Sequence, residues 1–82
     1  MPKSVFSLAY EQFRAHLIQA RTDAGLTQTD VAARLQRPQS YVSKYENGER
    51  RLDLVQLGWW CKALGCSLSD FVGRYEKLIL RR

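Results

Sequence analysis

Amide, hydroxyl and cationic side chains gather in the stretch RPQSYVSKYENGERR, Arg37–Arg51. If this stretch begins with a helix whose Val42 and Tyr45 face inward, one side of that helix is polar. The residues on the polar side are Gln39, Ser40, Ser43 and Lys44. Gln can bond adenine bidentately, Lys can reach O6 and N7 of guanine, and Ser can bond either base. The types and spacing of these residues are therefore suited to reading base edges in a DNA groove.

Positive charge follows this helix and characterises the whole chain. Arg50 and Arg51 are adjacent and follow the tight Asn47-Gly48 turn after Glu49, so they add positive charge just beyond the helix. The 82 residues include thirteen Lys and Arg against eight Asp and Glu, which gives a formal net charge of +5 and a pI near 9.6. A basic domain of this size suits a polyanionic partner, although many basic proteins bind none. Charge favours nucleic acid without specifying it.

Residues capable of catalysis or metal binding are few. His16 is the only histidine and has no Asp or Cys partner at a recognisable spacing, so we interpret it as a boundary residue. Cys61 falls on an apolar stripe, Cys66 begins the next connection, and the two lack metal-ligand spacing. There is no Gly-rich phosphate loop. We therefore expect two reduced thiols, no enzymatic activity, no metal site and no cofactor.

The elements that position the polar helix are themselves helical. Apolar residues at steps of three and four predict a long first helix that stops at Gly25. Its stripe is Phe6, Tyr10, Phe13, Leu17, Ala20 and Ala24. Thr27 with Asp30 predicts the capped start of a second helix, and Pro38 suits the first turn of a third. The turn between these short helices is too short to let them lie antiparallel, which predicts a helix-turn-helix unit at about 27–47.

Two more helices complete the chain. Asp53 is expected to cap a fourth helix, which ends at Gly65, and Ser67 a fifth helix at about 68–80. The fourth helix has the stripe Leu57, Trp60, Cys61 and Leu64, and the fifth carries Phe71, Val72, Tyr75, Leu78 and Ile79. No strand, repeat or linker is recognisable. We expect one all-α domain over residues 1–82.

Three segments, GLTQTDVAARL, PQSYVSKYENGERRLDL and KALGCSL, resemble the Cro and phage-repressor helix-turn-helix family, also called XRE-like. The similarity runs from about Phe13 to Val72. Its most specific part is Gly25–Gln28 together with Tyr45–Gly48 at this separation. The resemblance implies a compact five-helix bundle of the lambda-repressor-like type. It also implies a dimeric regulator of transcription that binds double-stranded DNA without a cofactor.

The resemblance assigns roles to individual residues. It places Gln39, Ser40, Ser43 and Lys44 at base-reading positions, and Gln28, Tyr41, Asn47, Arg50 and Arg51 at positions that contact the DNA backbone. Tyr41 lies on the flank of the recognition helix, where either a thymine methyl or a phosphate is in reach. Arg21 and Glu46 match a pair that forms an internal salt bridge in several members. The alternative for Glu46 is a solvent-facing helix end, although an acid that faces DNA would repel phosphate.

Four positions depart from the family pattern. Gln36 replaces the Gly of many members at the inter-helix turn, so a left-handed residue there is expected to be slightly strained. Pro38 replaces the usual Ser or Thr cap. Gly58 replaces a large aliphatic residue in mid-helix, at a cost of about 1 kcal/mol against Ala. Trp59 replaces a polar residue and is either ordinary boundary packing or an anchor at a subunit interface.

The last helix carries more apolar residues than one narrow stripe can bury. A large uncovered apolar patch usually marks association, so we expect a two-fold homodimer built from the fourth and fifth helices. The candidate interface residues are Trp59, Phe71, Tyr75, Leu78 and Ile79. Two recognition helices would then enter successive major grooves about 34 Å apart. The alternative is a monomer whose tail folds back on the first helix.

The functional prediction is a sequence-specific DNA-binding transcription regulator, in its most specific form a bacterial or phage repressor that reads a roughly palindromic operator. The alternative is a protein-interaction module, such as the antitoxin of a toxin–antitoxin pair, whose fold binds DNA and also a toxin. RNA binding has less support, because no aromatic platform for single-stranded bases is evident. No segment resembles a signal peptide or a membrane span. We therefore expect a cytoplasmic, nucleoid-associated protein without a membrane partner.

Overall fold

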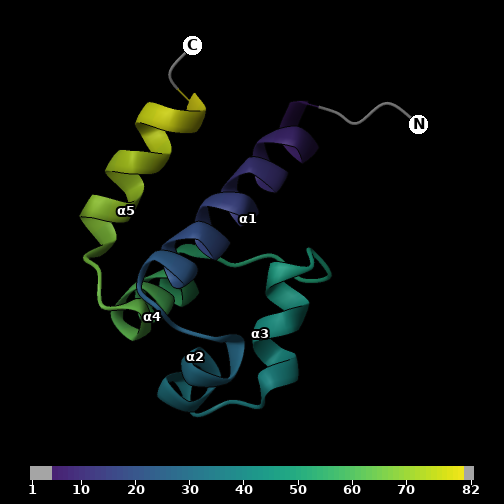
Figure 1. Cartoon of the computed structure of the whole chain (residues 1–82). Helices are drawn as coiled ribbons and strands as arrows, with labels where there is room; N and C mark the ends of the chain where they lie inside the picture. Colours follow the sequence, from purple (N-terminus) through teal and green to yellow (C-terminus); the bar gives the residue numbers. More distant parts are fainter. Residues whose placement is uncertain (1–4, 81–82) are drawn as a thin grey trace.

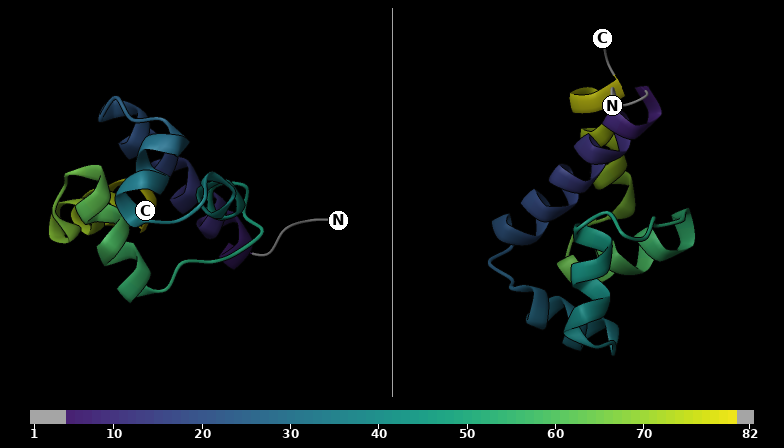
Figure 2. Two further views of the ribbon diagram at one scale, coloured as in Figure 1. Left: turned by 90° about the horizontal axis from the view of Figure 1, so that it is seen from below. Right: turned by 90° about the vertical axis from the view of Figure 1, so that its right-hand side faces the viewer.

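Five α-helices follow one another in the computed structural model, which describes residues 5–80 (Figure 1). They are α1 (Val5–Asp23), α2 (Gln28–Leu35), α3 (Gln39–Glu46), α4 (Leu54–Leu64) and α5 (Leu68–Tyr75), followed by a π-helical segment, Glu76–Leu80. The helices α1 and α5 lie side by side at one end of the molecule, and α2 and α3 lie at the other (Figures 1 and 2). The helix α4 packs against both α2 and α5. The predicted all-α fold of five helices is confirmed over residues 5–80.

Local sequence signals set the helix boundaries. The Thr27 hydroxyl accepts a hydrogen bond from the Asp30 backbone N–H, and the Asp30 carboxylate accepts one from the Thr27 N–H. Asp53 and Gln56 form the same reciprocal pair at the start of α4. The bond from the Thr27 N–H also lowers the pKa of the Asp30 carboxyl below its usual value, which keeps the cap charged. Because such pairs satisfy donors that a helix start leaves free, both helices begin where the sequence predicts.

The core lies where the five helices meet. Its buried apolar residues are Leu17, Val31, Ala32, Val42, Tyr45, Leu57, Trp60, Cys61, Ala63, Leu64 and Phe71. The predicted stripe of α4 is entirely within this set. Phe71 is only 3% exposed, and the rings of Phe13 and His16 pack against it. The prediction of Phe71 as an interface residue is therefore wrong, because the monomer already covers its side chain.

The turn between α2 and α3 passes through a left-handed residue. Gln36 has φ 57° and ψ 44°, and it is the one non-glycine residue with positive φ in the part of the chain that the structure describes. A side chain with a Cβ raises the energy of this conformation, as the sequence predicts for a turn without glycine. Pro38 has φ −65° and ψ 156°, so it is the N-cap of α3 and not part of its first turn. The helix starts one residue later because the Pro38 backbone is extended.

The end of the chain differs from its prediction. The sequence predicts one helix at about 68–80, but regular α-helix ends at Tyr75 and the chain continues as the π-helical segment. Apolar periodicity does not distinguish the two, because a π-helix differs mainly in its wider hydrogen-bonded turn. Leu78 in this segment is 71% exposed. The side chain of Ile79, a predicted interface residue, lies outside the described residues.

Gly58, in the middle of α4, is a position where stability can be gained. A Cβ added there meets only the Leu68 side chain, at 3.9 Å, an ordinary van der Waals distance. We expect Gly58→Ala to raise the free energy of unfolding by about 0.5–1 kcal/mol, because alanine loses less conformational entropy in a helix than glycine does. Urea denaturation measures the difference, and an unchanged or lower stability would contradict it. Gly48→Ala is the contrasting variant, since φ there is +83° and the added Cβ lies 2.9 Å from Arg14 Nε.

Candidate nucleic-acid interface

The helix α3 turns one polar side to solvent and buries the other side. The predicted base-reading residues Gln39, Ser40 and Lys44 are exposed, and Ser43 is half-buried. On the opposite side, Val42 and Tyr45 are 0% and 5% exposed. The Tyr45 hydroxyl also accepts a hydrogen bond from Gln56 Nε2 of α4 at 2.9 Å. The accessible polar side therefore belongs to a helix that the core holds in place.

A buried ion pair ties α3 to α1. Arg21 Nε donates to Glu46 Oε2 at 2.7 Å and Nη2 donates to Oε1 at 3.0 Å, so the guanidinium binds the carboxylate with two hydrogen bonds. The side chain of Glu46 is 2% exposed and that of Arg21 is 14% exposed. Arg21 Nη1 also donates to the Leu26 carbonyl at 2.8 Å, which ties the loop before α2 to the same group. The predicted internal salt bridge is confirmed, and the solvent-facing alternative for Glu46 is wrong.

Gln28 extends this ion pair to the surface of α3. Its Nε2 donates to Glu46 Oε1 at 2.9 Å, and its Oε1 accepts a hydrogen bond from Gln39 Nε2 at 2.6 Å. An amide nitrogen carries two hydrogens, so Gln39 keeps one N–H and its own carbonyl oxygen for another partner. The family resemblance places Gln28 at a DNA phosphate and does not predict this bridge. The sequence feature that could have predicted the contact between Gln28 and Gln39 is that each is the first residue of one of two short adjacent helices.

The turn after α3 is held by Tyr10 of α1, a residue whose spacing predicts only a place in the apolar stripe. The Tyr10 hydroxyl accepts a hydrogen bond from the Leu52 N–H at 3.0 Å and donates one to the Arg50 carbonyl at 3.5 Å. The Arg51 guanidinium lies over the Tyr10 ring, 4.4 Å from its centroid. Tyr10 thus fixes the backbone from which Arg50 and Arg51 project, while both arginines remain exposed.

Arg14 closes the C-terminal end of α3. Its Nη1 donates to the Glu46 carbonyl at 2.5 Å, an acceptor that a helix end leaves without an intrahelical partner. The left-handed Gly48 lets the chain pass close to this guanidinium. In the same turn, Asn47 Nδ2 donates to Ser43 Oγ at 3.2 Å. Ser43 and Asn47, assigned to base and backbone contacts respectively, are therefore linked to each other.

Tyr41 lies on the flank of α3 that faces α4. Its ring centroid is 4.9 Å from that of Tyr45 and 6.4 Å from that of Trp60, and the Arg37 guanidinium lies 5.6 Å from it. Burial, followed by the neighbouring Tyr45, raises the pKa of Tyr41 above its ordinary value. Tyr41 is therefore neutral and half-buried, so a DNA contact by this residue has to use the part of the side chain that remains exposed.

Apolar side chains surround a groove between α1, the start of α4 and α5. The groove has a volume of about 430 Å³, and Leu54 and Val72 line it with 67% and 41% exposure. Tyr75 also lines it and packs edge-on against Phe13 at 6.0 Å. The last residue of α5 thus packs on the first helix, yet apolar surface stays exposed beside it. Trp59, at 61% exposure, lines a different groove on α4.

Groups capable of catalysis are engaged in packing. The His16 ring packs against Phe71, and its Nε2 lies 3.3 Å from the Phe71 carbonyl oxygen. Both cysteines are free, and burial, with a contribution from Cys66, raises the pKa of Cys61 to about 12. Among the residues that the structure describes, no three His, Cys, Asp or Glu side chains form a group that could hold a metal ion. Within the same residues, every helix is too short or too polar to cross a membrane.

Comparison with known proteins identifies the family. The helix-turn-helix family profile matches residues 17–71, more than half of the chain. A solved structure, an XRE-family like protein from Pseudomonas syringae pv. tomato str. DC3000, is 39% identical, with 90% of each chain covered and a TM-score of 0.84. The chain belongs to the XRE-like helix-turn-helix family. No curated protein matches the sequence.

The region that matches the XRE-like family includes the candidate nucleic-acid interface. The matched region contains α2 and α3 in full and both members of the Arg21–Glu46 ion pair. The family is one of DNA-binding transcription regulators, so the predicted class of function and its DNA partner are confirmed at the level of the family. The predicted resemblance to this family is confirmed as well.

Proposed function

We propose that this protein is a sequence-specific transcription repressor that reads a roughly palindromic operator in double-stranded DNA. The observation that supports it is the polar side of α3, accessible on a helix that a buried bidentate ion pair and the core hold in place. A helix of this kind fits the major groove of B-DNA, which is about 12 Å wide. Occupation of promoter DNA by the protein blocks transcription without any cofactor.

Gln39, Ser40, Ser43 and Lys44 read bases in this proposal. The hydrogen bond to Gln28 limits the rotation of the Gln39 amide before DNA arrives, and Gln39 retains one donor and one acceptor. Those two groups are what bidentate bonding to adenine requires. Lys44, which is exposed on the same side of α3, reaches guanine O6 or N7, and the two short serines let the helix approach closely.

Arg50 and Arg51 contact phosphates, together with Gln28, Tyr41 and Asn47. The Tyr10 hydrogen bonds to the turn support this role for the arginines, because they keep the backbone at a fixed distance from α3. Phosphate contacts set the register of a protein on DNA without reading its sequence. The arginines then determine how closely and in which orientation α3 enters the groove.

A second copy of this chain occupies the apolar groove beside α1 in the proposed homodimer. Leu54 and Val72 support this, because both are apolar, both are exposed and both line the groove. Tyr75, which lines the groove, contributes to the interface. The exposed Leu78 stays a candidate, and so does Trp59, which lines a different groove on α4. A two-fold dimer places two copies of α3 in successive major grooves, which is why the operator is expected to be palindromic.

Selection from random DNA duplexes tests the proposal directly. The purified protein should enrich a palindrome whose half-site centres are one helical turn apart, about 10 bp. The control is a variant with Gln39→Ala and Lys44→Ala together, which should retain weak binding without enrichment. Failure of the unaltered protein to enrich any sequence would reject sequence-specific reading. Enrichment of an asymmetric site would reject the two-fold dimer.

Base-reading and phosphate-contacting residues should differ in how their loss depends on sequence and salt. We expect Gln39→Ala or Lys44→Ala to cost about 1–3 kcal/mol on the selected operator and to relax preference at one base pair. We expect Arg50→Ala or Arg51→Ala to weaken binding to all sequences alike. Each should also make the negative slope of log K against log salt less steep, by about one per lost phosphate contact. Fluorescence anisotropy on operator and scrambled duplexes measures both effects, and identical behaviour of the two classes would contradict the division.

A further inference from the structure

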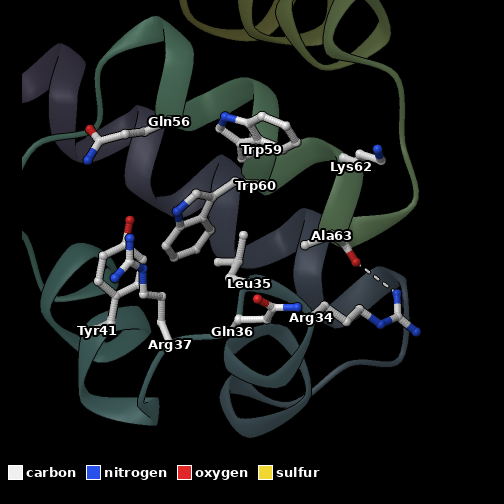
Figure 3. Close-up of a pocket in the computed structure, with 10 residues that line it drawn as sticks. All are labelled: Arg34, Leu35, Gln36, Arg37, Tyr41, Gln56, Trp59, Trp60, Lys62 and Ala63. Atoms are coloured by element: carbon white, nitrogen blue, oxygen red, sulfur yellow. Dashed lines mark hydrogen bonds between the residues drawn. The ribbon is translucent and has the colours of Figure 1, made fainter.

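A second groove runs along the side of the helix-turn-helix unit (Figure 3). It lies between the C-terminal end of α2 with the turn after it, the flank of α3 and one side of α4. Its volume of about 760 Å³ falls within the range of about 300–1,000 Å³ that is typical of small-molecule sites. It shares no lining residue with the apolar groove beside α1.

Aromatic rings form one wall of this groove. Trp60 is 1% exposed, Tyr41 is half-buried beside it, and Trp59 at the rim is 61% exposed. The rings of Tyr41 and Trp60 are inclined by 31° with their centroids 6.4 Å apart. An indole as exposed as that of Trp59 leaves apolar ring surface in water, and stacking against another ring covers such surface favourably. The wall therefore suits a ligand with a planar aromatic body.

The charge of the groove has one sign. Arg34, Arg37 and Lys62 line it, and none of its ten lining residues is acidic. The Arg37 guanidinium lies 5.6 Å from the Tyr41 ring centroid, and Lys62 Nζ lies 5.7 Å from that of Trp59. Arg34 is fixed by a 2.8 Å hydrogen bond to the Ala63 carbonyl, drawn in Figure 3. Cations set against aromatic rings complement a ligand that carries a negative charge on an aromatic body.

A buried donor in the same wall lacks an acceptor. The indole N–H of Trp60 is shielded from solvent and makes no hydrogen bond. In Figure 3 its nitrogen faces Tyr41, but no hydrogen bond joins the two side chains. Buried donors without a partner are rare and destabilising.

We propose that this groove binds a small planar aromatic carboxylate, and that binding weakens the hold on DNA. The ligand ring stacks on the exposed face of Trp59. Its carboxylate pairs with Arg37 and, as the Tyr41 ring moves outward, accepts the hydrogen bond of the Trp60 N–H. The structure thus assigns to one flank of α3 a ligand site separate from its base-reading side.

The effect on DNA rests on the proposed function of α3. Arg37 precedes α3 by two residues and Tyr41 is part of it, so the ligand carboxylate comes to lie next to the DNA-reading helix. A negative charge at this position repels DNA phosphates and neutralises a nearby cation. Because coupling between two sites is reciprocal, DNA must weaken ligand binding by the same factor as the ligand weakens DNA binding.

The binding half is tested on the free protein with 1-naphthoate as probe. Isothermal titration calorimetry should give a Kd on the order of 0.1–1 mM, and the neutral 1-naphthamide should bind at least about tenfold more weakly, since it lacks the charge that Arg37 recognises. Arg37→Gln should weaken naphthoate binding about tenfold, equivalent to the loss of one charge-assisted contact. Lys77→Gln removes an exposed cation outside the groove and should bind as the unaltered protein does.

The indole N–H signals in two-dimensional 1H–15N NMR spectra locate the ligand. The chain has two tryptophans, and Trp59→Phe identifies which signal belongs to Trp60. The Trp60 signal should shift on addition of naphthoate, because its N–H gains an acceptor. An unshifted signal, equal binding of naphthoate and naphthamide, or equal losses in Arg37→Gln and Lys77→Gln would each overturn the site.

The effect on DNA binding is tested by measuring the Kd for operator DNA with and without naphthoate. Saturating naphthoate should raise the Kd for DNA at least about fivefold, within the usual range of coupling between sites. Ligand binding with an unchanged Kd for DNA would overturn the regulation and leave the site standing. A protein that binds naphthoate as described but enriches no DNA sequence would reject the proposed function and, with it, the regulatory half.

Discussion

Glu46→Ala is expected to destabilise the protein by about 3–5 kcal/mol, because it leaves the largely buried Arg21 guanidinium, 14% exposed, without its counter-charge. The Glu46 side chain is 2% exposed, so water cannot replace the lost carboxylate without local opening. A domain of this length has a free energy of unfolding of about 4–12 kcal/mol in total. The substitution is therefore expected to remove a large part of it. Urea denaturation followed by circular dichroism measures the change.

Two further variants separate the charge from the loss of side-chain volume. Glu49→Ala makes the same change at an exposed position in the turn after α3, and its effect should stay within about 0.5 kcal/mol of the unaltered protein. Replacement of both Arg21 and Glu46 by Met removes the unpaired charge, so the double variant should be more stable than Glu46→Ala. If Glu46→Ala changed stability no more than Glu49→Ala does, the ion pair would not be the anchor of α3.

Glu46→Ala should also affect the base-reading residue Gln39. Glu46 Oε1 accepts the hydrogen bond from Gln28, and Gln28 in turn holds Gln39. Without the carboxylate, both amides regain rotational freedom, and Gln39 loses part of its orientation toward a base. Any loss of operator affinity should therefore be larger for operators that match at the base pair read by Gln39 than for those altered there.

Leu54→Glu is expected to weaken operator binding by about 100-fold or more, because it converts one bivalent contact into two independent ones. Leu54 is 67% exposed and lines the apolar groove in which the proposed second copy lies. In a two-fold dimer both copies carry the new carboxylate, so two negative charges enter an apolar interface. Leu54 is the first residue of α4. A glutamate at this position stabilises the helix, because its negative charge lies at the positive end of the helix dipole. The monomer should thus keep its stability.

Analytical ultracentrifugation and fluorescence anisotropy measure the two consequences of Leu54→Glu. The variant should sediment as a monomer at concentrations where the unaltered chain is a dimer, and its affinity for a single half-site should be unchanged. Leu8→Glu is the matched control, since Leu8 is 49% exposed on α1 and does not line the groove. A variant that still dimerises, or an unaltered protein that sediments only at 9.5 kDa, would contradict the proposed interface.

The starts of the helices and the polar side of α3 could be predicted because they depend on neighbours in the chain. Thr27 caps α2 through a residue three positions away, and apolar residues at steps of three and four specify which side of a helix is buried. The same local patterns placed Gln39 and Lys44 on the accessible side of α3. The Arg21–Glu46 pair joins residues 25 positions apart and was predicted only through the family resemblance.

Packing decided what local patterns cannot encode. The apolar stripe of the last helix marks Phe71 and Val72 as apolar, but only the fold buries the first and exposes the second. The spacing of Tyr10 predicts only another residue of the apolar stripe. In the structure its hydroxyl accepts a hydrogen bond from the backbone N–H of Leu52, 42 residues further along the chain. The groove between α2 and α4 likewise exists only because Arg37 and Trp59 are brought together. The sequence thus determined which face of each helix is apolar, and the tertiary structure decided what covers that face, because a contact partner depends on the path of the whole chain.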